Sequence, residues 1–269
     1  MADFAFIQIT DHHLPEQESD LPRGFSPTYS LRAILRHIAK NLGASADFIL
    51  STGDLVEPAT SQAYQNLFQM MQLQPGQRPP GPGWVTIEGL QSQAIYLMPG
   101  NHDDRLLFQK YLFTQASTES LINATFQHKG IQFVCLDMGA EPKAMLYRQT
   151  LDYLARALNS SLPTIVVTHH HVVPVGARWL DEFIAEDIDQ FWGLLTDPAS
   201  HKNILGVISA HSHLTYEKSV EGIPVFGVRS TAFPFAQIDE PMLTLLPPQY
   251  RLFEVKDGAL KSQVFTVKL

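Results

Sequence analysis

Five short polar clusters stand where apolar, strand-like runs of this sequence end. They contain carboxylates, imidazoles and one side-chain amide, which are residue types that can bind a metal ion or carry a proton. In chain order the clusters are Asp11/His13, Asp54, Asn101/His102, His169 and His211/His213. Because no thiolate is among them, the mixture favours Mn, Fe, Co, Ni or Zn in expanded coordination over a structural zinc site.

The spacing within the clusters suits shared ions. Asp11 and His13 are two residues apart. On a continuing strand, residues at this spacing point to the same side, so both can face one ion. Asp54 follows Gly53, and a glycine lets the backbone bend closely at a strand end. The Asp54 carboxylate has two oxygens and can therefore bridge two metal ions.

Such a pair of ions indicates phosphate chemistry. Two metals held about 3.5–4 Å apart can clamp a phosphate and lower the pKa of a bridging water toward about 7. Two divalent ions outweigh the charges of Asp11, Asp54 and a bridging hydroxide, so the site would be net positive. A net positive site favours an anionic phosphoester.

Alternating strand and helix patterns would position these clusters. Apolar runs predict strands directly before the clusters, at 4–10, 47–52, 94–98, 164–168 and 204–208. Apolar residues at helical spacing predict helices at 31–42, 64–71, 106–113, 151–158 and 188–195. Turn signals predict hairpins at Lys129-Gly130, Glu221-Gly222 and Asp257-Gly258. The last two lie in a β-rich region that starts near residue 214.

This order of elements predicts an α/β fold with mixed sheets. All five clusters lie past the carboxyl ends of strands, which is where open α/β sheets bind ligands. A stretch rich in Pro and Gly at 74–83 reads as a surface excursion, because strands and helices resume directly after it. We therefore predict a single domain, residues 1–269.

The composition of the chain excludes several classes of protein. Of 269 residues, 45% are apolar and 17% charged, which is typical of a globular domain. The net charge is −8 and Lys and Arg are not clustered, so we expect no binding to duplex nucleic acid. No apolar run approaches the roughly 20 residues of a membrane helix, so we expect no membrane association.

Compartment is predicted from cysteine usage and from the first residues. Cys135 is the only cysteine and lies in an apolar run, which favours a buried, inert thiol in a reducing compartment. The first residues lead directly into a strand pattern, with no basic leader and no cleavage site. We therefore predict a cytoplasmic protein.

In this order, the motifs Asp11-x-His13, Gly53-Asp54, Gly100-Asn101-His102-Asp103, His169 and His211-x-His213 resemble those of the calcineurin-like metallophosphoesterases. Within that superfamily the chain is most similar to the class III cyclic-nucleotide phosphodiesterases, and bacterial glycerophosphodiesterases resemble it almost as well. The residues that support this are the run from Gly100 to Arg105, the triple histidine 169–171 before Pro174-Val175-Gly176, and Tyr250-Arg251-Leu252 with Asp257-Gly258.

The resemblance implies a four-layer α/β/β/α sandwich with two mixed β-sheets, and two divalent or mixed-valence ions of Fe, Mn or Zn. It implies that one ion is held by Asp11, His13, Asp54 and His213, and the other by Asp54, Asn101, His169 and His211. His102 would serve as general acid at the leaving oxygen, and Asp103 would orient it. Arg105 and His170 are the predicted substrate contacts, with a surface salt bridge and a backbone carbonyl contact as their respective alternatives.

We therefore predict a binuclear metal-dependent phosphodiesterase that acts on small phosphodiesters by attack of a metal-bridging hydroxide, with 3′,5′-cyclic AMP as the first candidate. The alternatives are a glycerophosphodiesterase, a broad-specificity phosphoesterase, or a non-catalytic interaction module. One departure is Ala210, where the family usually has Gly; the methyl costs about 1 kcal/mol if φ is positive and is harmless otherwise.

Two aromatic residues and an apolar loop leave further alternatives open. Phe233 and Phe235 are predicted to make core or dimer contacts, although they could also line the substrate pocket. The apolar segment 233–248 and the β-rich C-terminal region could form a homodimer surface or a buried flap.

Overall fold

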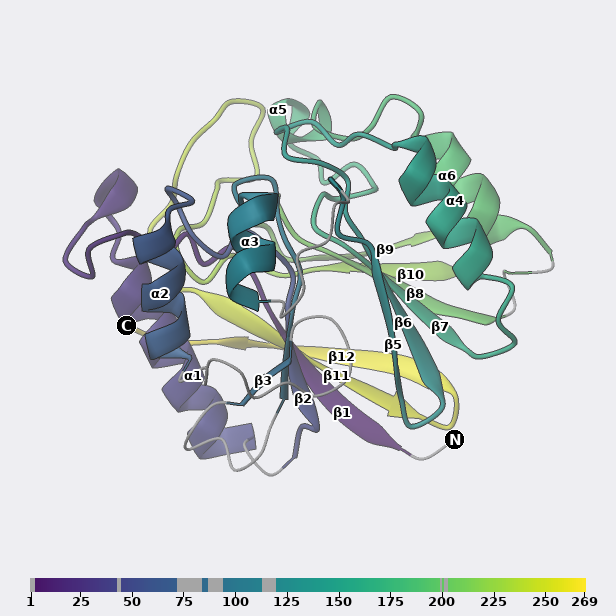
Figure 1. Ribbon diagram of the computed structural model, residues 1–269, viewed down its shortest axis with the longest axis horizontal. Helices are drawn as coiled ribbons and strands as arrows, with labels where there is room; N and C mark the ends of the chain where they lie inside the picture. The colour runs from purple at the N-terminus through teal and green to yellow at the C-terminus, as the bar shows by residue number, and fades with distance from the viewer. Residues whose placement is uncertain are drawn as a thin grey trace.

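The computed structural model describes residues 3–42, 45–71, 84–86, 94–112, 120–198, 200 and 203–269. The predicted surface excursion at 74–83 lies outside them. In the described part of the chain, two six-stranded sheets pack face to face, and helices cover the outer face of each (Figure 1). This is the predicted α/β/β/α sandwich with two mixed sheets.

The first sheet has the strand order β12-β11-β1-β2-β4-β3, in which β1, β2 and β4 are parallel. Its strands are β1 (Phe4–Ile9), β2 (Phe48–Ser51), β3 (Trp84–Thr86), β4 (Ala94–Leu97), β11 (Gln249–Lys256) and β12 (Ala259–Thr266). The helices on its outer face are α1 (Pro27–Leu42), α2 (Ser61–Met70) and α3 (Arg105–Leu112). Thr60 caps α2, because its hydroxyl accepts a hydrogen bond from the Ala63 N–H.

The second sheet has the order β5-β6-β7-β8-β10-β9, in which β6, β7, β8 and β10 are parallel. Its strands are β5 (Ala124–His128), β6 (Ile131–Leu136), β7 (Thr164–Thr168), β8 (Ile204–Ser209), β9 (Tyr216–Val220) and β10 (Ile223–Gly227). The helices α4 (Arg148–Ala157) and α6 (Ile188–Thr196) cover it. A further short helix, α5 (Arg178–Asp181), was not predicted, and one turn is too short to give a periodic signal.

The strand sequences explain the layering. Along β1, Phe4 and Phe6 face the second sheet, while Ile7 and Ile9 face the helices. Such alternation is what a strand buried on both sides requires. Phe6 meets Phe133 of the opposite sheet edge to face, with ring centroids 5.2 Å apart. The two sheets are thus held together by an aromatic core.

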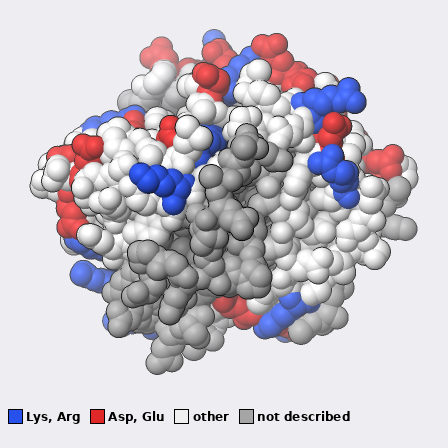
Figure 2. Space-filling model, viewed as in Figure 1, with Lys and Arg blue, Asp and Glu red and all other residues white. Residues whose placement is uncertain are grey.

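The three predicted hairpin turns are present, each with two residues of positive φ, as tight hairpins require. Cys135 is buried as predicted, and burial raises the pKa of its thiol to about 12. No helix in the described ranges is both long and apolar enough to cross a membrane. On the face drawn in Figure 2, Lys and Arg are interspersed with Asp and Glu.

Candidate metal centre and active site

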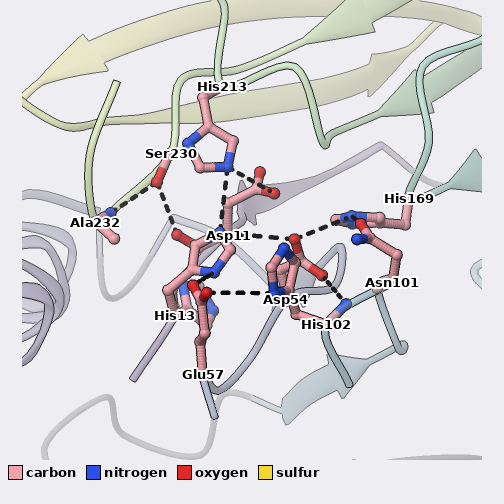
Figure 3. A network of polar contacts seen from close by, with 12 residues as sticks. Asp11, His13, Asp54, Glu57, Asn101, His102, His169, His213, Ser230 and Ala232 are labelled. Atoms are coloured by element: carbon pink, nitrogen blue, oxygen red, sulfur yellow. Dashed lines mark hydrogen bonds and ion pairs between the residues drawn. The ribbon is translucent and has the colours of Figure 1, made fainter. Parts of the chain in front are cut away.

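The loops after β1 and β2 run side by side and carry the first two clusters. The Asp11 N–H donates to the Gly53 carbonyl at 3.0 Å, and the His13 N–H donates to the Asp54 carbonyl at 2.9 Å. These bonds continue the parallel pairing of the strands beyond their ends. Since β4, β7 and β8 carry the other clusters at their carboxyl ends, the five clusters meet at one edge of the sandwich (Figure 3).

The predicted ligands are held by unusual backbone. Positive φ angles of 43–63° occur at Asp11, His13, Asp54, His211 and His213. Non-glycine residues adopt this left-handed region only at a cost in conformational energy. Residues that do so are often found at functional sites. The expectation that Asp11 and His13 lie on a continuing strand is therefore wrong: two left-handed residues, rather than strand alternation, bring their side chains together. Ala210 is not among the described residues with positive φ, so its methyl group is harmless.

Two glycines allow the loops to approach. A Cβ atom on Gly100 would lie 2.2 Å from Asp54 Oδ1, and one on Gly53 would lie 2.5 Å from His169 Nδ1. Real Cβ atoms do not make such contacts. Gly53 and Gly100 are therefore required for the close approach of Asp54 to the loop after β4.

The side chains form two buried groups that share Asp54. Within each group one ligand atom per residue lies within 4.8 Å of the others. The first group is Asp11, His13, Asp54 and His213, and the second is Asp54, His169 and His211. Asn101 adjoins the second group, because its Oδ1 lies 3.1 Å from His169 Nε2.

The separations between ligand atoms fit metal binding. Two ligands at 2.0–2.2 Å from one ion in tetrahedral geometry stand roughly 3.3–3.6 Å apart. His213 Nε2 lies 3.4 Å from Asp11 Oδ1 and 3.2 Å from His13 Nε2. His13 Nε2 and His169 Nε2 lie 3.6 and 3.3 Å from Asp54 Oδ2. Each group can thus surround a common ion.

The hydrogen bonds of the histidine rings also favour metal binding. His213 Nδ1 lies 2.6 Å from the Phe233 carbonyl, and His169 Nδ1 lies 2.8 Å from the Thr52 carbonyl. Oxygens of these kinds only accept, so each Nδ1 carries the proton and each Nε2 presents a lone pair. The lone pairs face the carboxylates of Asp11 and Asp54, and such an arrangement requires a cation or a proton between them.

Three predicted ligands have buried atoms that lack a hydrogen-bond partner in the described structure: both oxygens of Asp11, His13 Nδ1 and His211 Nε2. Buried polar atoms are rarely left unpaired unless they bind an ion or water or serve catalysis. The chemistry of the site therefore fits divalent metal ions.

The electrostatics of the groups are strongly coupled. Burial alone would raise the pKa of Asp54, but His169 and His13 hold it well below its usual range. Burial alone would lower the pKa of His169, but Asp54 raises it to about 9. Burial and the neighbouring His169 lower the pKa of His170 to about 3. Asp54 and His169 thus stabilise each other's charged forms, while His170 is held in its neutral form.

The loop 230–233 contacts two members of the first group, Asp11 and His213. The Ser230 hydroxyl donates to the Asp11 carbonyl at 2.7 Å and accepts from the Ala232 and Phe233 N–H groups (Figure 3). The Phe233 carbonyl in turn accepts from His213. This loop therefore fixes the left-handed turn at Asp11 and the ring of His213 together.

The structure places three predicted residues differently from expectation. Asp103 does not contact His102; its carboxylate accepts from the Leu55 and Gly100 N–H groups and from the Tyr64 hydroxyl. Burial and Asp54 raise the pKa of Asp103 to about 6, against these hydrogen bonds. Asp103 thus ties the loops after β2 and β4 together.

Arg105 is engaged by the protein itself. Its guanidinium pairs with Asp137 through Nε and Nη2 and donates to the carbonyls of Gly100, Asp103 and Gly139. All five of its N–H groups have protein acceptors, so none is left for a phosphate. His170 Nε2 donates to the Glu141 carbonyl at 2.9 Å, which is the alternative given above for this residue.

Two residues that contact the site, Glu57 and Arg23, were not predicted. Glu57 Oε2 lies 2.9 Å from His13 Nδ1, and Glu57 Oε1 lies 3.5 Å from His102 Nδ1. Arg23 binds the Glu57 carboxylate through both Nη atoms, at 2.9 and 3.1 Å. Burial opposes it, but His13 and Arg23 hold the pKa of Glu57 well below its usual range. Arg23 lies in a single 3-10 turn (Pro22–Gly24) and Glu57 lies in a loop, and neither segment carries a periodic signal in the sequence.

A small cleft of about 140 Å³ opens over the two groups. It is lined by Asp54, Asn101, His102, His13, His211 and His213, and by Arg23, Pro142, Trp179, Leu180, Phe183, Phe233 and Phe235. Phe233 and Phe235 therefore line the cleft, which sequence reasoning had given as the lesser alternative.

Comparison with known proteins identifies the family. The calcineurin-like phosphoesterase family model matches residues 4–214. The chain belongs to this family. It is 27% identical to a probable cyclic nucleotide phosphodiesterase of Colwellia psychrerythraea, covering 96% of this chain and 93% of the relative. It is 25% identical to the 3′,5′-cyclic adenosine monophosphate phosphodiesterases of Haemophilus influenzae and Escherichia coli, each over 96% of this chain and 88% of the relative.

The family match confirms the prediction of a calcineurin-like phosphoesterase. Among solved structures, the fold is similar to GAP50, described as the anchor in the inner membrane complex of Plasmodium, with a TM-score of 0.68 and 10% identity over 99% of this chain and 85% of that one. A 5′-nucleotidase assigned as putative, from Staphylococcus aureus, gives 0.55 with 12% identity over 99% of this chain and 54% of that one. Both likenesses concern the fold alone.

Proposed function

We propose that this protein is a binuclear metallophosphodiesterase of small phosphodiesters, and that 3′,5′-cyclic AMP is the first substrate to test. The observation that carries the proposal is the sharing of Asp54 between two buried ligand groups. A carboxylate common to two groups is what a bridged pair of ions requires. The names of the relatives, which are cyclic nucleotide phosphodiesterases, support the choice of substrate.

The ligands we propose for one ion are Asp11, His13, Asp54 and His213, and those for the other are Asp54, Asn101, His169 and His211. When bound, two ions supply positive charge for the phosphate oxygens and an activated water as nucleophile. The available metals share these ligands, so Fe, Mn and Zn all remain candidates.

The chain's own residues supply the rest of the chemistry. His102 belongs to neither shared group but lines the same cleft, so it can deliver a proton to the leaving oxygen as general acid. The aromatic walls exclude water from one side of the cleft. Arg23 lines the cleft and uses two of its five N–H groups on Glu57, which leaves donors for the anionic end of a substrate.

A substrate panel tests the proposal. Metal-reconstituted enzyme is assayed on cyclic AMP, glycerophosphocholine, bis(p-nitrophenyl) phosphate and p-nitrophenyl phosphate. We expect the diesters to be turned over faster than the monoester, with cyclic AMP the best natural substrate. A dominant rate on the monoester would contradict the diesterase assignment, and a preference for glycerophosphocholine would replace the cyclic nucleotide by the glycerophosphodiester alternative.

A further inference from the structure

Three aromatic rings line the cleft beside the proposed metal ligands. Trp179, Phe183 and Phe235 are each partly exposed and line the cleft. We propose that these three rings, the aromatic subsite, bind the nucleobase of the substrate by stacking and so favour cyclic nucleotides over other small phosphodiesters. This inference rests on the proposed function, because it assigns a specificity-determining surface to the same cleft.

The rings of the aromatic subsite form a corner rather than a flat wall. The Trp179 ring stands at 85° to Phe235, with ring centroids 4.9 Å apart, and at 86° to Phe183, with centroids 6.1 Å apart. A flat group can lay its face on one ring of such a corner and its edge against another, and both arrangements are favourable for aromatic pairs. Stacking of this kind accepts any base, because every base has a π-face. The corner therefore suits a planar heterocycle.

The aromatic subsite adjoins both groups of proposed ligands. The ring centroid of Phe183 lies 5.5 Å from that of His211. The ring centroid of Phe235 lies 4.6 Å from that of His213. In a 3′,5′-cyclic nucleotide a single ribose carries both the phosphate and the base. A phosphate bound over the two ligand groups therefore brings the base to within one sugar of these rings.

The charges along the cleft favour a neutral group over a cationic one. Among the described residues that line it, Asp54 is the single carboxylate, and both ligand groups share it. Arg23 lines the same cleft, with its guanidinium 4.5 Å from the centroid of the Phe233 ring. A quaternary ammonium such as choline can bind aromatic rings, but here it would meet an arginine and the proposed metal ions without a free carboxylate. A neutral nucleobase avoids this like-charge repulsion.

The two segments that carry the rings are joined to each other by the protein itself. Gln237 Nε2 donates to the Val175 carbonyl at 2.6 Å, and Asp181 Oδ1 accepts from the Val175 N–H at 2.6 Å. Val175 thus connects the turn that carries Trp179 to the segment that carries Phe235. Fixing the rings before the ligand arrives reduces the entropy that is lost on binding.

The kinetic test removes the flat face of Trp179 but keeps an apolar side chain. Metal-reconstituted wild type, Trp179→Leu and Trp179→Phe are assayed on cyclic AMP and on a base-free counterpart, methyl riboside 3′,5′-cyclic phosphate, and metal content is measured in each sample. We expect Trp179→Leu to lower kcat/KM for cyclic AMP by roughly 10–100-fold, mainly through KM, with a loss of no more than about threefold on the base-free substrate. Trp179→Phe should restore most of the loss, because it restores an aromatic face.

Phe68→Leu is the matched control, because Phe68 is a partly buried ring on α2 that is not among the residues lining the cleft. It should leave both rates unchanged. Equal losses on both substrates in Trp179→Leu would mean that Trp179 supports the fold or the metal ions, and would overturn the inference. A loss on glycerophosphocholine without a loss on cyclic AMP would assign the rings to a cation and would overturn it as well.

A second readout does not depend on turnover. Zinc-loaded wild-type protein with ¹⁵N-labelled tryptophan is titrated with a phosphorothioate analogue of cyclic AMP that is hydrolysed slowly. The indole resonance of Trp179, assigned by its absence from Trp179→Phe, should shift through the ring current of the stacked base. The resonance of Trp192 should not shift, because its N–H donates to the Val172 carbonyl at 3.0 Å and its ring does not line the cleft.

The two readouts separate the aromatic subsite from the proposed function. An unmoved Trp179 resonance in an enzyme that hydrolyses cyclic AMP would refute the subsite and leave the proposed function standing. Binding of the analogue with the expected shift, in a metal-loaded protein that does not hydrolyse cyclic AMP, would refute the proposed function and leave the subsite standing.

Discussion

Two regions of the molecule can be compared: the core between the sheets, and the edge of the sandwich where the strands end. Adjacent stretches of the chain form both regions. Phe6 and Phe48 stack at 5.0 Å in the core, while Asp11, His13 and Asp54 follow the same two strands within a few residues. In the core, side chains are apolar and follow regular strand geometry. At the edge, five residues have a left-handed backbone, buried polar atoms lack partners in the described structure, and two glycines have no room for a Cβ atom.

The strand residues themselves pack the core, and the residues that directly follow the strands form the candidate site. The core buries apolar side chains, whereas the edge buries acceptors that lack a hydrogen-bond partner in the described structure and that bound cations would pair. Proteins commonly tolerate such strained, unsatisfied groups where activity requires them, and offset them by packing elsewhere. The following changes test whether the two regions are as independent as this comparison implies.

The largest effect is expected at the shared carboxylate. Asp54→Ala should remove both the bound metal and the activity, with a loss of about 10⁴-fold or more, because each ion contributes several kcal/mol to the transition state. Elemental analysis and diesterase assays measure the outcome. Full metal content in this variant would show that Asp54 does not bridge the two groups.

His102→Ala should separate catalysis from metal binding at the same edge. We expect turnover to fall by roughly 10²–10⁴-fold while metal content stays near that of the wild type, because His102 lies in neither of the groups that share Asp54. If the substitution emptied the site instead, His102 would be a ligand and the roles assigned here would be wrong.

Phe48→Ala tests the core. Phe48 is 1% exposed and contacts aromatic rings of both sheets, so its truncation should lower the free energy of unfolding by about 3–5 kcal/mol. Denaturant titration measures the change. Tyr29→Ala is the control, since Tyr29 is 55% exposed and should cost no more than about 0.5 kcal/mol. A small loss at Phe48 would contradict the assignment of stability to this core.

Removing metal with a chelator measures how much the edge contributes to the free energy of unfolding. At free metal about 100-fold above its Kd, bound metal adds about 2.7 kcal/mol per site, so its removal should lower the Tm by roughly 5–10 °C. The same drop is expected in Phe48→Ala, because distant, independent contributions add. Asp54→Ala should show no drop, and a chelator effect in that variant would place the metal elsewhere.

The elements of the fold could be predicted because each carries a local pattern. Alternation in β1 and helical spacing in α1 reflect burial, and the turn at Lys129-Gly130 reflects backbone freedom. The meeting of the five polar clusters could be predicted for the same reason: each directly follows a strand, and parallel strands that end at one edge bring their following loops together.

Side-chain partnerships across loops could not be predicted. Arg105 was expected at the substrate, but Asp137, which is 32 positions further along the chain, engages it. Asp103 was expected to hold its neighbour His102, but the backbone directs it to Leu55. Glu57 gave no signal, because its contacts with His13 and Arg23 join segments that are far apart in the sequence. These contacts are set by tertiary geometry rather than by spacing.

The central claim is that two metal ions bind on either side of Asp54. Anomalous diffraction from crystals of zinc- or manganese-loaded protein, combined with elemental analysis of the same preparation, tests it most directly. Two anomalous peaks per chain are expected, one beside Asp11 and His213 and one beside Asn101 and His169, with Asp54 contacting both. A single peak, or peaks at any other place in the chain, would contradict the account.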